Sequence, residues 1–271
     1  MSIPIWQVDA FANAPFTGNP AAVCLLDKYP GDAWMQSVAA EMNLAETSFV
    51  VPLQRQGEFH LRWFTPAVEV DLCGHATLAA AHTLIEQRRV APGEAIRFQT
   101  RSGMLVCQQN DHVITLDFPS TPIIETVAVP LANEVRQSLG VDRATVLRSK
   151  FDLVAVVDNA STVRSVTPDF NRLGKIDTRA VMITARSDTP DVDFISRVFA
   201  PRVGINEDPV TGSAYCCLAP YWGELLDKTS LVAYQASKRG GTVSCQIAGD
   251  RVEISGTAVT VMKATLLVYP E

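Results

Sequence analysis

Two related stretches of this chain decide its fold. The first reads Phe64-Thr-Pro-Ala-Val-Glu-Val-Asp-Leu-Cys-Gly-His-Ala-Thr-Leu-Ala-Ala-Ala81, and the second reads Phe199-Ala-Pro-Arg-Val-Gly-Ile-Asn-Glu-Asp-Pro-Val-Thr-Gly-Ser-Ala-Tyr-Cys217. Each contains a strand, a turn that ends in Gly and a polar side chain, and then small apolar residues typical of a buried helix. A glycine at the start of a helix leaves backbone N–H groups unshielded, which favours the binding of an anion. We therefore expect two half-molecules that together hold one carboxylate-bearing substrate.

The two stretches align residue by residue. Phe64 corresponds to Phe199, and Pro66 corresponds to Pro201. With three extra residues in the second copy, Cys73-Gly74-His75-Ala76 corresponds to Thr211-Gly212-Ser213-Ala214. The residues at these two helix starts are therefore candidates for contact with the substrate.

The composition is that of a globular protein with a substantial core, since 47% of the residues are hydrophobic and 19% are charged. A net charge of −6 offers no basic excess to neutralise phosphates, which argues against nucleic acid as a partner. No apolar run approaches the roughly 20 residues that cross a bilayer, and the first residues lack the pattern of a secretion signal. We therefore expect a cytoplasmic protein, without a membrane partner, whose six cysteines are buried, reduced thiols.

Strands outnumber helices in the predicted order of elements. The hydrophobic spacing predicts one long helix in each half, at about 76–89 and 213–226, and Pro220 should kink or interrupt the second. Another helix is expected at 32–42. The fold class is therefore α+β, with each half curling a mostly antiparallel, barrel-like sheet around its own helix.

The length of the chain and its internal repeat predict two domains. We place the N-terminal domain at 1–119 and the C-terminal domain at 120–257, with the linker at Pro119 to Pro122. The last segment, 258–271, is expected to form a strand that returns to the N-terminal domain.

Several polar side chains near the predicted helix starts could take part in proton transfer. Glu46 is the one carboxylate in Asn43-Leu-Ala-Glu-Thr-Ser-Phe-Val-Val51, where it either points to solvent or lies in a cleft as a general acid/base. His75 could donate to a substrate carboxylate, relay a proton or cap its own helix. Asp208 is turn-forming by residue type, but the repeat places it near the second helix start. Ser213 could cap that helix, bind the ligand, or do both.

The densest basic loop in the chain is Gln235-Ala-Ser-Lys-Arg-Gly-Gly241. Glycines beside Lys238 and Arg239 could let this loop fold a cation over an anionic substrate, so Arg239 and Gly240 are candidate substrate-binding residues. A solvated hairpin turn explains the same composition equally well.

Several kinds of chemistry lack their sequence signals. The chain has no Walker loop and no Gly-x-Gly-x-x-Gly that opens a helix after a strand, so no nucleotide cofactor is expected. The four histidines show no metal-ligand spacing, and a Gly-x-Ser-x-Gly elbow is missing. We therefore expect neither a cofactor nor a metal.

A series of ordered segments resembles the PhzF-like (phenazine biosynthesis) isomerases over essentially the whole chain. These segments are Val8–Phe11, Phe16–Pro20, Leu44–Phe49, Phe64–Pro66, Val70–Thr77, Glu207–Ala214 and Ile254–Ala258. The family shares its fold with diaminopimelate epimerase and proline racemase. The resemblance implies two pseudo-symmetric domains, each a barrel-like sheet around a central helix, with the active site in the cleft between them. It also implies a homodimer.

The resemblance further implies cofactor-independent isomerisation by moving a proton next to a carboxylate or a nascent carbonyl. Glu46 matches the family's general acid/base. His75, Asp208 and Ser213 match residues that assist proton transfer and hold the substrate, and Gly74 and Gly212 match those that supply backbone N–H groups.

One departure separates this chain from the epimerases and racemases that share the fold, which use two facing cysteines. Cys73 occupies one of these positions, but its counterpart in the second repeat is Thr211. A threonine hydroxyl is a poor base near neutral pH, whereas a thiolate is accessible. We therefore favour Glu46 as a single base on one face of the substrate, with Cys73 and Thr211 as substrate-binding residues.

Two other functions remain open. The chain could be an epimerase or racemase of an amino or hydroxy acid that uses Cys73 with Glu46. It could also be a protein that binds a small carboxylate without turning it over.

Overall fold

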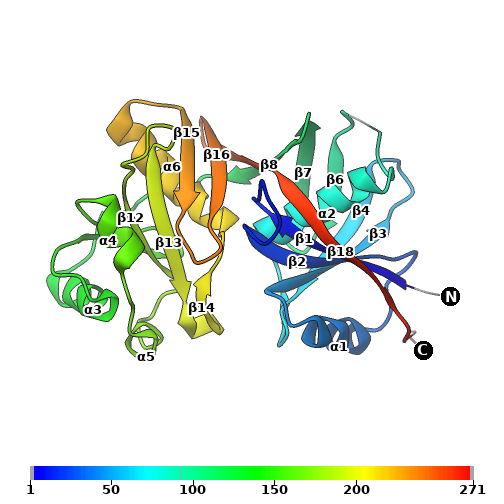
Figure 1. Ribbon diagram of the computed structural model, residues 1–271, viewed down its shortest axis with the longest axis horizontal. Helices are drawn as coiled ribbons and strands as arrows, with labels where there is room; N and C mark the ends of the chain where they lie inside the picture. The colour runs from blue at the N-terminus through cyan, green and yellow to red at the C-terminus, as the bar shows by residue number, and fades with distance from the viewer. Residues whose placement is uncertain (1–2, 92, 269–271) are drawn as a thin grey trace. The chain divides into compact units, whose positions relative to one another are not determined.

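The computed structural model describes residues 3–91 and 93–268, which form two compact units (Figure 1). Unit 1 consists of the described residues of Met1–Asp117 and Ile254–Glu271, and unit 2 is Phe118–Glu253. Strands dominate both units, and each has one long buried helix. This arrangement confirms the predicted α+β class.

Unit 1 is built on a sheet with the strand order β18-β1-β2-β3-β4-β6-β7-β8. The strands of unit 1 are β1 (Ile3–Ala10), β2 (Asn19–Leu25), β3 (Glu46–Pro52), β4 (Glu58–Phe64), β5 (Glu69–Val70), β6 (Ile96–Thr100), β7 (Gly103–Asn110), β8 (Val113–Pro119) and β18 (Ala258–Leu266). The last strand, β18, pairs with the first, β1, in antiparallel orientation. Residues 269–271 of the predicted final strand lie outside the described residues.

The helix α2 (Gly74–Glu86) lies among the strands of unit 1 and packs against β1, β2, β3 and β18 (Figure 1). Its residues Ala76 and Leu78–Ala81 are completely buried. Small side chains let the strands approach the helix on several sides, which explains the alanine-rich sequence. Serine also anchors it, because the Ser48 hydroxyl donates to the Ala76 carbonyl at 3.0 Å.

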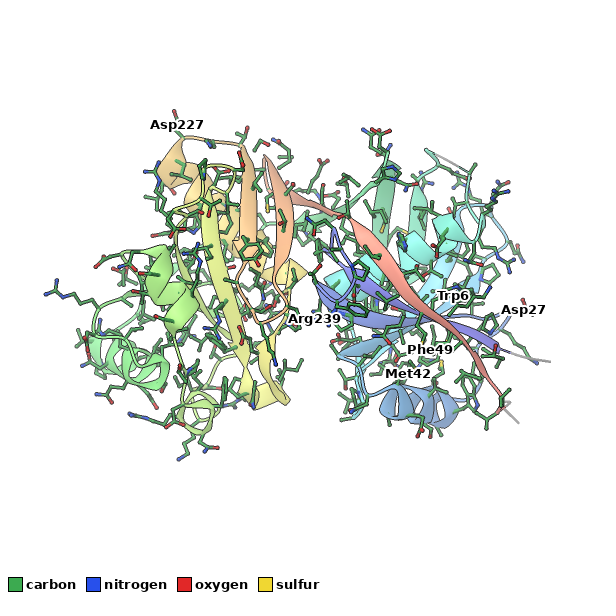
Figure 2. The ribbon with its side chains drawn as sticks, in the orientation of Figure 1. Trp6, Asp27, Met42, Phe49, Asp227 and Arg239 are labelled. Atoms are coloured by element: carbon green, nitrogen blue, oxygen red, sulfur yellow. The ribbon has the colours of Figure 1, made fainter. Side chains whose placement is uncertain are left out.

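The other helix of unit 1, α1 (Asp32–Met42), has the bounds that the sequence predicts. It lies outside the strands, at the bottom of the view in Figure 1. Met42 on this helix and Phe49 on β3 are labelled in Figure 2, and both belong to an apolar cluster that also contains Met35 and Val38. No helix among the described residues is both long and apolar enough to cross a membrane.

Unit 2 repeats the plan of unit 1. Its strands are β9 (Glu125–Thr126), β10 (Thr145–Arg148), β11 (Leu153–Val156), β12 (Val181–Arg186), β13 (Phe194–Ala200), β14 (Ile205–Asp208), β15 (Ser230–Gln235) and β16 (Gly241–Ala248), and β17 (Arg251–Gly256) carries the chain back to unit 1. The order β10-β11-β12-β13-β15-β16 has the same succession of antiparallel and parallel pairs as β1-β2-β3-β4-β6-β7. The two units therefore share one topology.

Four helices accompany the strands of unit 2, together with a short 3₁₀ turn. They are α3 (Val129–Leu139), α4 (Ala160–Ser165), α5 (Phe170–Leu173) and the central helix α6 (Gly212–Leu226), and the turn is η1 (Pro201–Val203). In Figure 1, α6 runs beside β15 and β16, on which it packs. The position of α6 agrees with the helix that the sequence predicts at about 213–226.

Of the two effects that the sequence predicts for Pro220, the interruption does not occur, because α6 continues from Gly212 to Leu226, and the kink stays a prediction. A proline inside a helix removes one N–H donor and leaves the carbonyl four residues earlier without its helical partner. That carbonyl belongs to Cys216, and it accepts a hydrogen bond from the Thr121 backbone N–H at 2.9 Å. The chain between β8 and β9 thus replaces the lost helical hydrogen bond.

A bidentate ion pair precedes the central helix in both units. Arg62 on β4 contacts both carboxylate oxygens of Glu69 on β5, each at 2.7 Å. Arg197 on β13 contacts both oxygens of Glu207 on β14, at 2.7 and 3.0 Å. Each glutamate lies four residues before the residue that caps its helix. These pairs tie the turn at the helix start to the neighbouring strand.

Removal of a central-helix side chain should destabilise the protein strongly. Leu78 on α2 is completely buried, so Leu78→Ala should lower the free energy of unfolding by about 2–5 kcal/mol. The matched control is Leu225→Ala on α6, where the side chain is 58% exposed and the expected change is within about 0.5 kcal/mol. Urea unfolding of both variants measures the difference, and equal losses would contradict this description of the core.

Candidate active site

Glu46 and His75 form a buried pair in unit 1. Glu46 is the first residue of β3, and His75 is the second residue of α2. Glu46 Oε2 lies 3.1 Å from His75 Nε2, and at most one tenth of either side chain is exposed. The possibilities that Glu46 points to solvent and that His75 caps its own helix are therefore both wrong. The helix cap is Cys73.

The second ring nitrogen of His75 also has close neighbours. His75 Nδ1 lies 3.1 Å from Asn19 Nδ2 and 3.4 Å from Cys73 Sγ. In the neutral ring the amide of Asn19 donates to Nδ1 and the proton on Nε2 faces Glu46, whereas the charged ring has a proton on both nitrogens and requires the amide oxygen of Asn19 at Nδ1. The imidazole is thus oriented toward the carboxylate by groups on its opposite edge.

Asn19 reaches His75 because of the turn before β2. Gly18 has a φ of +66°, and a Cβ atom there would collide with the backbone oxygen of Ala10. Only glycine fits this position without strain. The turn is also held by Asp9, which is completely buried and accepts a hydrogen bond from the Phe16 backbone N–H at 2.7 Å.

Burial and charge have opposite effects on the acidity of the neighbouring groups. Burial and the charge of Glu46 raise the pKa of Cys73 to about 11, so its thiol is protonated near neutral pH. Burial lowers the pKa of His75, but Cys73 and Glu46 outweigh it and raise this pKa well above its usual value. The site therefore favours a neutral thiol and a positively charged imidazole.

The side chains of Glu46, Cys73 and His75 also offer ligand atoms for a metal ion. One such atom from each lies within 4.8 Å of the others. The sulfur lies at Nδ1, however, whereas the carboxylate lies at Nε2, on the other edge of the ring. A single ion would need the imidazole to turn before all three could bind it, so the arrangement fits a chain of proton donors and acceptors better than a metal site.

The corresponding helix start in unit 2 brings together Asp208, Thr211 and Gln235. The Thr211 hydroxyl donates to Asp208 Oδ2 at 2.5 Å. Gln235, which is completely buried, accepts from the Thr211 backbone N–H at 2.9 Å and donates to the Asp208 carbonyl at 2.7 Å. The helix cap Thr211 makes no side-chain capping bond of its own. Gln235 therefore holds the turn that begins α6.

Gly212 and Ser213 are the first two residues of α6, and Gly212 is buried while Ser213 is half-buried. Ser213 Oγ accepts a hydrogen bond from Arg179 Nη1 at 3.3 Å. In unit 1, Gly74 opens α2 in the same way and is half-buried. The predicted site residues Gly74 and His75 are therefore the first two residues of α2, and Gly212 and Ser213 are the first two residues of α6.

The basic loop between β15 and β16 lies beside the Asp208 turn within unit 2. The Ser237 hydroxyl donates to the Pro209 carbonyl at 2.8 Å and accepts from the Gly240 backbone N–H at 3.1 Å. Gly240 has a φ of +68°, and a Cβ atom there would collide with the Tyr234 hydroxyl. Gly240 therefore has a structural reason to be glycine. Figure 2 shows Arg239 on this loop, where its contact with a substrate stays a prediction.

Three residues of these two sites were not predicted as site residues. Asn19 lies in the segment Phe16–Pro20, which carries part of the family resemblance, and that segment was the available signal. Gln235 begins the basic loop, but the sequence draws attention to the cations that follow it. Arg179 has no local signal, because its contact with Ser213 joins residues 34 positions apart.

A family model described as phenazine biosynthesis-like protein matches residues 8–264. An uncharacterized isomerase of Halalkalibacterium halodurans is 49% identical over 267 residues, covering 98% of this chain and 99% of the relative. The crystal structure of a PhzF family protein from Enterococcus faecalis has a TM-score of 0.93 and 42% identity, covering 99% of this chain and all of that one. The chain belongs to the PhzF family.

This PhzF family member is an isomerase, as the sequence predicts. Its fold extends to more distant proteins. A hydroxyproline epimerase from Agrobacterium vitis, solved with bound trans-4-hydroxy-L-proline, has a TM-score of 0.63 at 15% identity, covering 98% of this chain and 91% of that one. That likeness shows the shared fold alone and confirms the epimerase-like architecture expected from the sequence.

The pH dependence of stability tests the charge on His75. Its pKa in the folded protein is raised above the unfolded value of about 6.5, so the stabilisation is complete below about pH 6.5 and is lost as the pH rises through the folded pKa. The free energy of unfolding of the wild type, minus that of His75→Gln, should therefore fall when the pH is raised from about 6 to about 9. Urea unfolding of both proteins at each pH measures this difference in the free energy of unfolding. A difference that is constant or grows with pH would show that the imidazole is not held in its charged form.

Proposed function

We propose that this isomerase moves a proton on a small carboxylate-bearing substrate, with Glu46 as the general acid/base. The contact between Glu46 and His75 is the observation that carries the proposal. A buried carboxylate at the start of β3, beside the imidazole at the start of α2, can take a proton from carbon and return it. An exposed carboxylate would instead be solvated and poorly positioned.

The chemistry requires no group beyond the substrate and these side chains. Glu46 removes a proton from the carbon next to the carboxylate or to a nascent carbonyl, and the electron pair of that C–H bond moves into the adjoining π system. Glu46 then returns the same proton to another carbon of that system. The imidazole of His75 lies beside this carboxylate, with 3.1 Å between Nε2 and Glu46 Oε2. The double bond has then moved, while the atoms and the charge of the substrate are unchanged.

The starts of the central helices supply the means to hold an anion. The first N–H groups of a helix have no helical acceptor, and the helix dipole favours a negative charge there. Gly74 and Gly212 open α2 and α6 without a side chain that would shield these groups. Ser213, Thr211 and Asp208 add polar side chains to the second start. The proposal assigns to them the holding of the substrate, and to Asp208 also a part in proton transfer.

The epimerase or racemase alternative depends on Cys73. The contact of 3.4 Å between Cys73 Sγ and His75 Nδ1 favours it, because the imidazole then connects a thiol to the Glu46 carboxylate. The pKa of about 11 opposes it, since few thiolates form near neutral pH at such a value. We therefore place Glu46 ahead of Cys73 as the base.

The homodimer and the cytoplasmic location expected from the sequence also stay proposals.

Substitution of Glu46 should abolish proton transfer. Glu46→Gln keeps the shape of the side chain and removes the base, so deuterium incorporation from D₂O should fall by about 10²- to 10⁴-fold. The panel should contain cyclohexa-2,5-diene-1-carboxylate, a dihydroaromatic acid with an acidic C–H next to its carboxylate, and the common α-amino acids. Mass spectrometry measures the exchange.

The control for this experiment is Glu41→Gln on α1, where the side chain is exposed and exchange should match the wild type. Cys73→Ala should retain most of the exchange. Exchange that survives in Glu46→Gln and disappears in Cys73→Ala would replace the proposal with the epimerase alternative. Binding of an acid from the panel without exchange of any acid would favour a protein that binds without turnover.

Ser213→Ala tests the role of the second helix start. If Ser213 holds the substrate, its loss should raise KM about tenfold and leave kcat within a factor of about two, because one hydrogen bond to a charged group is removed. Steady-state rates on the acid that shows exchange measure both constants. A large loss confined to kcat would instead assign Ser213 to the path of the proton.

A further inference from the structure

The strand register identifies the residue of unit 2 that corresponds to Glu46. In unit 1, Glu46 directly precedes the β3 residue that pairs with Phe64 on β4. In unit 2, Ala180 directly precedes the β12 residue that pairs with Phe199 on β13. Phe64 and Phe199 occupy the same place in the repeat, so Ala180 corresponds to Glu46. Unit 2 therefore lacks the carboxylate that unit 1 has at this position.

A cation lies beside this position in unit 2. Arg179, the residue before Ala180, donates through Nη1 to Ser213 Oγ at 3.3 Å. Ser213 corresponds to His75, the residue that Glu46 contacts at 3.1 Å in unit 1. The second residue of the central helix thus has a carboxylate as its neighbour in unit 1 and a guanidinium in unit 2. The two helix starts thus have the same backbone plan, but the charged group beside the second helix residue is an anion in unit 1 and a cation in unit 2.

Asp152 orients the guanidinium of Arg179. Arg179 Nε and Nη2 donate to the two carboxylate oxygens of Asp152 at 2.8 and 2.5 Å. Asp152 is only 3% exposed, whereas the side chain of Arg179 is 40% exposed. The Nε and Nη2 atoms of the guanidinium are therefore held by a buried carboxylate, and Nη1 points toward Ser213. An arginine held in this way loses little further side-chain entropy when it binds an anion.

Other charged and aromatic groups surround Arg179 within unit 2. Its guanidinium lies 5.5 Å from the centre of the Phe151 ring, and Lys150 Nζ lies 5.1 Å from the same ring. The negative charge of Asp208 also acts on Arg179. The Thr211 hydroxyl donates to Asp208 and holds that carboxylate in the turn before α6. The exposed part of this group therefore includes the guanidinium of Arg179, the ammonium of Lys150 and the Phe151 ring, with the half-buried Ser213 hydroxyl beside them.

We propose that Arg179 binds the carboxylate group of the substrate. The fork of an arginine matches the two oxygens of a carboxylate, and the Ser213 hydroxyl can donate to the same group once it turns from its present role as acceptor. The inference rests on the proposed function, because it names the residue that holds the anionic part of that substrate. Arg179 acts in binding, and Glu46 remains the base.

Binding of an inert carboxylate tests this role without any turnover. Benzoate has no proton that can be removed next to its carboxylate, and benzamide has nearly the same shape without the charge. Saturation-transfer NMR on the full chain gives the dissociation constant of each. The wild type should bind benzoate more tightly than benzamide. Loss of Arg179 should weaken benzoate binding by about 10- to 100-fold and leave benzamide unchanged, since a charge-assisted hydrogen bond is lost.

The choice of variant prevents a folding defect from imitating this result. Arg179→Met alone would leave Asp152 buried and unpaired, so the main variant is Arg179→Met with Asp152→Asn. The matched control is Arg164→Met with Asp188→Asn, which removes an exposed ion pair of unit 2 with contacts of 2.8 and 2.5 Å. Arg179→Lys should restore part of the benzoate binding, because it keeps the charge and loses the fork. Thermal unfolding confirms that each variant is folded.

The outcomes separate this inference from the proposed function. Glu41→Gln on α1, outside both helix starts, should bind benzoate like the wild type. Unchanged benzoate binding in the Arg179 variant, or a wild type that does not prefer benzoate to benzamide, would overturn the role of Arg179. Exchange that persists in Glu46→Gln would overturn the proposed base while the role of Arg179 in binding still stood.

Discussion

The burial of a helix inside a curled sheet is the constraint on which the rest of this structure depends. A helix enclosed by strands must have small side chains, and α2 meets this requirement with Ala76 and the run Leu78–Ala81. Polar side chains at its start are buried as well. His75 lies between Glu46 on one ring edge and Asn19 and Cys73 on the other. The packing of the helix thus creates the arrangement that can move a proton.

The two units show how one backbone plan can hold different chemistry. Their strand pairings follow the same succession, and in both a bidentate arginine–glutamate pair ties down the turn before the central helix. These ion pairs hold the turn before the central helix against the neighbouring strand, and both units need that turn. The side chains at the helix starts differ, since His75 lies beside Glu46 in unit 1 and Ser213 lies beside Arg179 in unit 2. A duplicated fold can thus place different charged groups at corresponding positions of its two copies.

Local spacing predicted much of the fold and part of the site. The bounds of α1 and the positions of the two central helices follow from hydrophobic periodicity, which depends only on neighbouring residues. Pro220 shows the limit of such reasoning. Its effect on α6 depends on Thr121, which supplies a hydrogen bond to Cys216 from a distant part of the chain. Asn19, Gln235 and Arg179 were missed for the same reason, since their partners lie 24 to 56 positions away.

The sequence by itself determined the duplication, the α+β class, the family and the residues at the two helix starts, because each is written in contiguous motifs. Only the tertiary structure decided what surrounds those residues. It placed Glu46 beside one ring nitrogen of His75, and burial there raises the pKa of the Cys73 thiol. It also placed Arg179 beside Ser213, the residue of unit 2 that corresponds to His75. These properties arise from burial and from contacts between separate strands. Both depend on pairings between strands that are distant in the sequence, such as β2 with β3 and β11 with β12, and these pairings exist only in the folded chain.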